Sequence, residues 1–350
     1  MEYRQLGRSG LRFSKLVLGT MTFGGSGEFS AVGDTDLTGA RRQIDMALDA
    51  GVNVIDTADV YSSGLAEEII GQALTDGRRD RVLLATKARF PMGSGPNDAG
   101  LSRHHLTRAC EASLRRLRAD HIDLYQMHEW DGQTPLEETL GALDELITAG
   151  KVRYVGCSNF AGWQVMKALG SARLHDLPEF VSQQVYLSLQ ERSAEYEIVP
   201  SAVEEGLGLL IWSPLAGGLL SGKYRRGQPP PEGSRHAGEW DEPPVYDEDK
   251  LYDTIETLVE IAEDRGVSAA RVAIAWLLAR PGITSVIVGA RTDEQLADNL
   301  AAATLELSAA EHARLEAVSR PPLIYPFWHQ HNTAGDRLSA GDLALLRQYG

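Results

Sequence analysis

The sequence predicts an α/β protein built as a closed (β/α)8 barrel. Eight short apolar runs of strand type alternate with helix-type runs nearly from end to end, at intervals of roughly 25–40 residues. These runs lack strict polar alternation, as expected of parallel strands buried on both faces. An open doubly wound sheet is the alternative, but no G-x-G-x-x-G register follows the first strand. The predicted strands are Leu16–Gly19, Val52–Ile55, Val82–Thr86, Ile122–Met127, Val152–Cys157, Val181–Gln184, Leu207–Trp212 and Thr284–Val288.

Three further regions flank or interrupt this barrel. Residues 1–14 predict a β-hairpin that turns at Gly7–Gly10 and covers one barrel end. The barrel is expected over residues 15–320 and a C-terminal extension over 321–350, so the whole chain is predicted to form one domain. Between the seventh and eighth strands, Tyr224–Lys250 is rich in Pro, Gly and charge and predicts a long loop. Loops of this length in compact domains are often functional lids.

The helices between the strands carry recognisable ends. The run TPLEETLGALDELITAGK predicts a helix with Thr134 as N-cap, Glu137 closing a capping box, and Gly150 as the left-handed residue beyond its end. Two more helices, Leu251–Gly266 and Ser268–Ala279, are expected before the eighth strand.

Composition restricts the partners. The chain has 49 acidic and 34 basic residues and a formal charge of -15, which argues against nucleic acid or an anionic membrane surface as partner. An anionic ligand would therefore need a local positive pocket. No run approaches the length of a membrane span and no signal-peptide pattern opens the chain, so a cytoplasmic protein is expected. Cys110 and Cys157 lack metal or C-x-x-C spacing and are expected to be reduced core residues.

Polar residues follow the predicted strands at their carboxyl ends, where barrels of this type form their active sites. Because all these ends face one mouth, their side chains are expected to gather there. The strand-end residues are Asp56, Lys87, His128, Ser158, Asn159, Gln184, Trp212, Ser213 and Gly289 to Arg291.

Tyr61, five residues beyond Asp56, suggests proton donation at this mouth. A tyrosine has an ordinary pKa of about 10, and a neighbouring ammonium such as that of Lys87 is expected to lower it. Asp56 can pair with Lys87, which offsets the cost of a buried carboxylate. With His128 donating to a substrate oxygen, the set suits protonation of an oxygen that becomes negative, such as a carbonyl receiving hydride.

The chain resembles the aldo-keto reductases over residues 1–330. The motifs that carry the resemblance, in order, are GVNVIDTADVYSSGLAEEIIG, ATK, IDLYQMHEWD, GKVRYVGCSNF, SQQVYLSL, WSPLAGGLLSGKY and VIVGARTDEQLADN. The resemblance implies an NADPH-dependent carbonyl reductase, active on a small-molecule aldehyde or ketone, with Tyr61 as general acid assisted by Lys87, Asp56 and His128.

The same resemblance implies the cofactor contacts. Ser158, Asn159 and Gln184 would hold the nicotinamide carboxamide, and Trp212 would stack on the ring. The run SPLAGGLLSGK would wrap the pyrophosphate, and the run from Gly289 to Asn299 would take the adenosine end. The full expected set is Gly19, Thr20, Asp56, Ser158, Asn159, Gln184, Trp212, Ser213, Leu215, Gly217, Lys223, Gly289, Arg291, Gln295 and Asn299.

One departure from the family concerns the cofactor's 2′-phosphate. Many members read PKS and then an arginine where this chain has Val288-Gly289-Ala290 and Gln295, so the lysine that meets the phosphate is missing. Arg291 is the best replacement, because a guanidinium suits bidentate contact with phosphate. NADPH is therefore expected in preference to NADH.

Two other functions compete with carbonyl reduction. A cofactor-binding regulatory subunit would resemble the potassium-channel β subunits, which share this fold and can keep the four residues, but no dedicated docking segment is evident. A metal-dependent barrel hydrolase could use Asp56, Asp59, His128 and Glu129, but it lacks a His-x-His strand pair and leaves Lys87 without a role. No metal site is therefore expected, and the sequence indicates no oligomeric state.

Aromatic residues in the loops and the tail are candidates for the substrate walls. They favour a sizeable or aromatic carbonyl over a small one, with a keto-sugar as a further candidate. They are Trp130, Trp240, Tyr325, Phe327 and Trp328.

Overall fold

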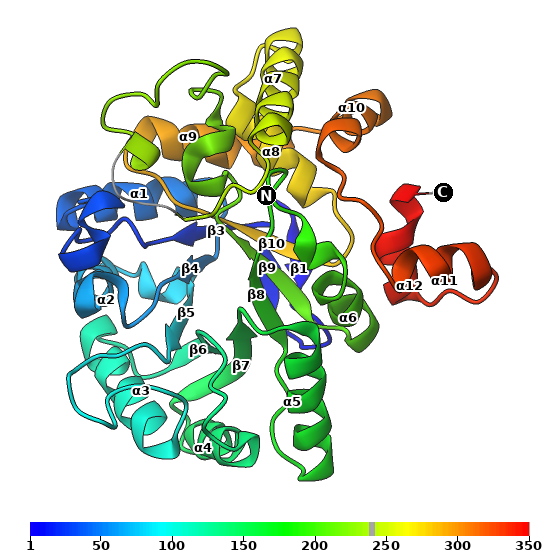
Figure 1. Cartoon of the computed structure of the whole chain (residues 1–350). Helices are drawn as coiled ribbons and strands as arrows, with labels where there is room; N and C mark the ends of the chain where they lie inside the picture. Colours follow the sequence, from blue (N-terminus) through cyan, green and yellow to red (C-terminus); the bar gives the residue numbers. More distant parts are fainter. Residues whose placement is uncertain (238–241, 350) are drawn as a thin grey trace.

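The computed structural model describes residues 1–237 and 242–349 (Figure 1). Within them, eight parallel strands close into a barrel, because β10 pairs with both β3 and β9. The predicted (β/α)8 barrel is confirmed, and each strand begins and ends within two residues of the prediction. The strands are β3 Leu16–Gly19, β4 Val54–Asp56, β5 Leu83–Ala88, β6 Ile122–Met127, β7 Val152–Ser158, β8 Ser182–Tyr186, β9 Gly208–Trp212 and β10 Ile283–Val288.

Helices surround this barrel (Figure 1). Their apolar faces pack on the strands in one extensive core, in which Cys110 and Cys157 are both buried and free. The helices are α1 Leu37–Asp49, α2 Leu65–Ala73, α3 Arg103–Leu117, α4 Leu136–Thr148, α5 Gly162–Leu174, α6 Ile198–Glu205, α7 Glu248–Arg265, α8 Ala269–Leu278, α9 Asp293–Ala301, α10 Ala309–Ser319, α11 Phe327–Thr333 and α12 Ala340–Leu346. Among the described residues, no helix combines the length and apolar character that a bilayer span needs.

The N-terminal hairpin closes the amino end of the barrel. Its strands, β1 Tyr3–Gln5 and β2 Arg12–Ser14, pair antiparallel, as predicted. Leu6 and Phe13 are fully buried and pack into the barrel interior with Val17 and other inward-facing residues. Because the hairpin fills this end, only the carboxyl end of the strands is left for a site.

Helices α4 and α7 do not start at the predicted residues. Helix α4 starts one residue later than expected, with Pro135 in the N-cap position. Thr134 does not cap it because its hydroxyl donates to Asp131 (2.7 Å). The long loop ends before Lys250, since Asp247 accepts a hydrogen bond from the Lys250 backbone amide and starts α7 at Glu248. Gly150 takes the predicted left-handed conformation, with φ of 73°.

The C-terminal extension lies outside the ring of barrel helices, beside α6 (Figure 1). Its helix α12 packs on α6, where Gly341 approaches the carbonyl of Pro200. Phe327 stacks on Tyr196 with ring centroids 5.8 Å apart, while Tyr325 and Trp328 remain exposed. Phe327 thus contacts the loop between β8 and α6, and Tyr325 lies against Trp328, with ring centroids 6.2 Å apart. That these three residues form substrate walls stays a prediction. Trp240 lies outside the described residues.

Candidate active site

An ion pair between Lys87 and Asp56 lies at the base of the barrel mouth. The Lys87 ammonium, fully buried at the end of β5, donates to the Asp56 carboxylate (2.5 Å) and to the carbonyl of Thr57 (2.8 Å). The two strands are neighbours, so their last residues meet without any long loop. The predicted pair is present, and it compensates both buried charges.

The Tyr61 hydroxyl lies 3.3 Å from the Lys87 ammonium. Ser62 and Ser63 turn the chain directly after the tyrosine with left-handed φ values of 49° and 56°. The Ser62 hydroxyl fixes this turn by donating to the Phe23 carbonyl (3.0 Å). Each left-handed non-glycine residue carries strain, so the surrounding contacts hold Tyr61 in one place over the ion pair.

The predicted direction of the Tyr61 pKa is wrong. Burial raises the pKa of Tyr61, and this outweighs the opposing effect of the Lys87 charge and hydrogen bond. The side chain therefore keeps its proton at neutral pH. An acid that holds its proton until a neighbouring oxygen becomes negative still suits proton donation.

His128 faces Tyr61 across the mouth, with ring centroids 5.9 Å apart. Burial lowers the pKa of His128 well below its ordinary value, and the positive charges of Lys87 and Arg89 lower it further. The imidazole is thus neutral, with its Nδ1 atom buried and without a hydrogen-bond partner among the described residues. A neutral ring beside the phenol can donate one hydrogen bond to a substrate oxygen.

Two glutamine amides hold the second oxygen of Asp56. Gln126 donates to it at 3.1 Å and Gln184 at 2.8 Å. Gln184 was expected to face the nicotinamide, whereas in this structure its amide is turned toward the carboxylate. Gln126 was not predicted, although it lies in β6 two residues before His128, which directly follows the strand. The period of two in a strand was the signal that could have found it.

The expected nicotinamide contacts lie together at the ends of β7 and β9. Asn159, in a left-handed conformation with φ of 58°, accepts a hydrogen bond from the Trp212 indole (2.9 Å) and donates to the carbonyl of His128 (3.2 Å). Ser158 is buried and its hydroxyl has no partner in the described part of the chain. A buried hydroxyl without a partner is costly, so this group fits a ligand amide. Tyr186 lies against Trp212, with centroids 4.9 Å apart.

Gly19 and Thr20 border the same region from β3. Gly19 pairs with Asp56 in the parallel ladder. Thr20 donates to the Asp56 carbonyl through both its amide (3.1 Å) and its hydroxyl (2.9 Å). In this structure Thr20 therefore fixes the backbone of Asp56.

The expected pyrophosphate turn lies under the long loop. Ser213 has a φ of 49°, and its hydroxyl accepts from the amide of Gly217 (3.0 Å), while Leu215 precedes the short 3-10 helix Ala216–Ser221. A Cβ at Gly217 would lie 2.7 Å from His236, so only glycine allows the loop to approach this closely. The long loop thus covers the turn, as a lid would.

Three cations gather beside this turn. Burial lowers the pKa of Arg235 to about 10, with a further contribution from Arg291. The pKa of Lys223 is also lowered, by burial first and then by Arg291 and Arg235. Positive charges that disfavour one another in this way are typical of a site for phosphate groups. Arg235 was not predicted, because nothing in the sequence shows where the loop folds back.

The Arg291 side chain bridges the segment before α1 and the long loop before α7. Its guanidinium donates to the carbonyls of Val32 (2.9 Å), Gly233 (3.0 Å) and Ala31. Its backbone amide donates to the side chain of Gln295 (3.0 Å). Asn299, also expected at the adenosine end, donates to the carbonyl of Gly289 (3.3 Å).

Aromatic side chains border Asp56, Tyr61, Lys87 and His128, here called the tetrad, on two sides. Phe29 meets the Tyr61 ring edge-on at 5.6 Å, and Phe90 meets the His128 ring edge-on at 4.8 Å. Neither was predicted, since Phe29 lies in the short 3-10 helix Gly27–Ala31 and Phe90 in the loop after β5. Trp130 is half-buried and packs on Phe160 at 5.2 Å.

No group of three or more His, Cys, Asp or Glu side chains within residues 1–237 and 242–349 could hold a metal ion. Asp59 is fully buried, and no side chain in those ranges donates a hydrogen bond to its carboxylate. Burial raises the pKa of Asp59 well above its ordinary value, and the nearby Glu67 adds to the shift. Asp59 therefore behaves as a buried neutral acid.

Asp59→Asn is expected to stabilise the protein at pH 7.5 more than at pH 4.5. Because the folded pKa is raised, the unfolded chain releases its proton first, and folding stability is lost as pH rises above about 3.9. The loss approaches about 1.4 kcal/mol per pH unit until the folded pKa is reached. Urea unfolding of both proteins at the two pH values measures the difference. A stability difference that does not change with pH would contradict this account.

The comparisons with known proteins agree with this geometry. A family model described as "Aldo/keto reductase family" matches residues 15–320. The chain belongs to the aldo/keto reductase family. Like other aldo/keto reductases, it is an oxidoreductase, and the family acts on carbonyl compounds with a nicotinamide cofactor.

Three relatives of this aldo/keto reductase align over most of both chains. "Uncharacterized oxidoreductase YrpG" of Bacillus subtilis (strain 168) is 43% identical over 317 residues, 88% of this chain and 92% of the relative. "Probable voltage-gated potassium channel subunit beta" of Oryza sativa subsp. japonica is 40% identical, over 86% of this chain and 91% of the relative. A protein of the same name from Arabidopsis thaliana is 38% identical, with the same two shares.

Proposed function

We propose that this protein reduces an aldehyde or ketone to an alcohol, with NADPH as the preferred cofactor and Tyr61 as general acid. The observation that carries the proposal is the position of the Tyr61 hydroxyl, 3.3 Å from the Lys87 ammonium and beside the neutral His128. We also propose that residues 1–350 form a single reductase domain. When bound, the nicotinamide supplies the hydride.

The chain's own residues then stabilise and protonate the carbonyl oxygen. Tyr61 and His128 donate hydrogen bonds to that oxygen from two sides, so negative charge that develops on it is stabilised. Tyr61 transfers its proton to the oxygen as the charge appears. The Lys87 ammonium, held by Asp56 at 2.5 Å, stabilises the phenolate that is left.

Two parts of the chain fit the cofactor. The unpartnered hydroxyl of Ser158, with Asn159 beside it, would hold the carboxamide, and Trp212 would lie against the ring. Gln184 would also contact the carboxamide if its side-chain amide turned away from Asp56, to which it donates in this structure. The cations Lys223, Arg235 and Arg291 would hold the phosphates under the long loop.

NADPH oxidation in the presence of a panel of aldehydes, ketones and keto-sugars tests the proposal. We expect turnover with at least one class, and a KM for NADH roughly 10-fold or more above that for NADPH, because a charge-assisted phosphate contact contributes about 1.5–3 kcal/mol. Tryptophan fluorescence measures the affinity of both cofactors independently of turnover. Equal affinities would contradict the contact between Arg291 and the 2′-phosphate of NADPH.

A second candidate function is that of a cofactor-binding subunit of another protein. It is favoured by the two plant relatives named as potassium channel subunits, at 40% and 38% identity. Very slow turnover with tightly retained cofactor, together with stoichiometric binding of a partner, would support it. Multiple turnovers with a simple aldehyde would favour the reductase.

A further inference from the structure

Arg89 lies two residues beyond Lys87 along the chain, and its side chain is expected on the same, inward side of the barrel. Leu83 and Ala85 belong to the cluster inside the barrel, and Lys87 reaches the tetrad, so side chains two residues apart on β5 point inward. Arg89 is the next in this series, directly after the strand ends at Ala88. It therefore lies at the mouth, above the ion pair.

The surroundings of Arg89 fix its place beside the tetrad. Its guanidinium carbon lies 5.5 Å from the centre of the Phe90 ring, and that ring lies 4.8 Å from the His128 ring. Burial lowers the pKa of His128, and the charge of Arg89 is one of the two that lower it further. Burial raises the pKa of Glu129, and Arg89 opposes that shift. Arg89 thus adjoins the place where a substrate oxygen meets His128.

Apart from its contact with the Phe90 ring, the guanidinium of Arg89 has no hydrogen-bond or ion-pair partner in the described part of the chain. Its Nε atom is buried without a hydrogen bond, and no carboxylate in residues 1–237 or 242–349 lies within ion-pair distance. Glu129, the nearby acid, instead accepts a hydrogen bond from the backbone amide of Trp130 (3.1 Å). A buried donor left unpaired is costly, so the site as it stands favours an acceptor from outside the chain.

Among the described residues beside Tyr61 and His128, Arg89 is a cation that no ion pair neutralises. The ammonium of Lys87 is neutralised by Asp56, and His128 is neutral. The cations assigned to the cofactor phosphates lie around the turn after β9, which is opposite β5 in the strand order of the barrel. In a chain of net charge -15, such a local cation is what an anionic ligand requires.

We propose that Arg89 binds an anionic group, carboxylate or phosphate, carried by the carbonyl substrate. The inference rests on the proposed carbonyl reductase function and deepens it by naming a substrate class. The guanidinium offers paired N–H donors to two oxygens of the anion, while Phe90 and Phe29 contact the apolar part of the substrate. In this arrangement the carbonyl of the substrate lies at Tyr61 and His128, and its anionic group lies at Arg89, next to the end of β5.

The test compares 4-carboxybenzaldehyde with benzaldehyde in the native protein, Arg89→Gln and Arg89→Lys. We expect the native enzyme to favour the carboxylate in kcat/KM. In Arg89→Gln this preference falls roughly 10- to 100-fold, mostly through KM, because a charge-assisted hydrogen bond is lost. Arg89→Lys keeps the charge but not the paired donors, so it retains part of the preference. Glyceraldehyde 3-phosphate against glyceraldehyde, measured in the same variants, shows whether phosphate is the better anion.

Arg153→Gln is the matched control, since it removes the same charge from an exposed position on β7. It should leave the preference unchanged. An equal preference in native protein and Arg89→Gln would overturn the proposal, as would equal loss in Arg153→Gln.

A binding experiment separates failure of this inference from failure of the reductase function. Benzoate and the neutral benzamide are titrated against tryptophan fluorescence in the native protein and Arg89→Gln. Saturable binding of benzoate alone, lost in the variant, supports the anion site even if no aldehyde is reduced. Binding that is absent in the native protein, or equal in both proteins, overturns it even if turnover is fast.

Discussion

Tyr61→Phe is expected to lose carbonyl reduction, with kcat falling roughly 10²- to 10⁴-fold, the usual contribution of a positioned general acid. The substitution removes only the hydroxyl that lies 3.3 Å from Lys87. The ring keeps its edge-on contacts with Phe29 and His128, so the fold and the shape of the mouth are retained. Steady-state NADPH oxidation with the best aldehyde of the panel measures the change.

The matched control for this variant is Tyr154→Phe. Tyr154 is half-buried and packs against the cluster inside the barrel at its other end, away from the tetrad. We expect its turnover to equal that of the native protein. Cofactor affinity, read from tryptophan fluorescence, should be the same in all three proteins. Native turnover in Tyr61→Phe would remove the general acid role from this residue and leave His128 as the remaining donor.

The residues at the strand ends could be predicted because the barrel topology alone places them. Lys87 meets Asp56 because adjacent parallel strands end at the same level, whatever the loops do. Gln126 could have been found in the same way, since it lies in β6 two residues before His128. Strand periodicity is thus enough to predict the base of the candidate site.

The walls and the electrostatics of the site could not be predicted in this way. Phe29 and Phe90 reach the tetrad from a short 3-10 helix and a loop, whose paths depend on distant contacts such as that of Ser62 with Phe23. The direction of the Tyr61 pKa depends on how deeply these contacts bury the phenol, and burial outweighs the ammonium. The position of the C-terminal extension could not be predicted for the same reason, because it depends on the packing of α12 on α6.

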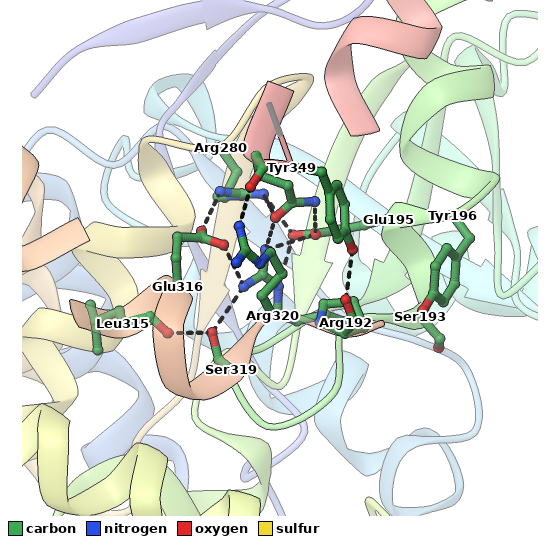
Figure 2. A network of polar contacts seen from close by, with 12 residues as sticks. Arg192, Ser193, Glu195, Tyr196, Arg280, Leu315, Glu316, Ser319, Arg320 and Tyr349 are labelled. Atoms are coloured by element: carbon green, nitrogen blue, oxygen red, sulfur yellow. Dashed lines mark hydrogen bonds and ion pairs between the residues drawn. The ribbon is translucent and has the colours of Figure 1, made fainter. Parts of the chain in front are cut away.

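A buried ionic network anchors that extension (Figure 2). Arg192 is fully buried and donates to Glu195 (2.8 Å), Glu316 (2.9 Å) and Ser319 (2.9 Å). Arg280 donates to both acids as well, at 3.0 Å and 2.7 Å. Both guanidiniums lie close to the buried ring of Trp276, each 4.9 Å from its centre.

The extension joins this network through its final turn. The Gln348 side chain accepts hydrogen bonds from Arg192 and from Arg280 (3.2 Å) and donates to Glu195 (3.0 Å). Burial tends to raise the pKa of Glu195, but Arg192 and Arg280 outweigh burial, and the net direction is downward. The acid is therefore charged in the folded protein at neutral pH, and its burial depends on the two arginines.

Arg192→Met is expected to lower the free energy of unfolding by about 3–5 kcal/mol, the usual cost of breaking a buried ion pair on one side. Methionine fills much of the volume beside Trp276, so the loss reports the missing charge rather than a cavity: the two acids, Glu195 and Glu316, then share the charge of Arg280 alone. Because Gln348 loses a donor at the same time, we expect proteolysis to remove the extension sooner than in the native protein. Urea unfolding and limited proteolysis followed by mass spectrometry measure the two effects.

Arg314→Met is the control, because it removes the same charge from an ion pair that is not buried. Arg314 is partly exposed and pairs with the exposed acids Glu260 (2.7 Å) and Asp264 (3.5 Å), and each such surface pair contributes about 0–1 kcal/mol. If Arg192→Met costs no more than Arg314→Met, the network does not anchor the extension, and the packing of α12 on α6 must hold it alone. If the cost is large, it should shrink as pH falls, because protonation of Glu195 removes the charge that the lost guanidinium had compensated.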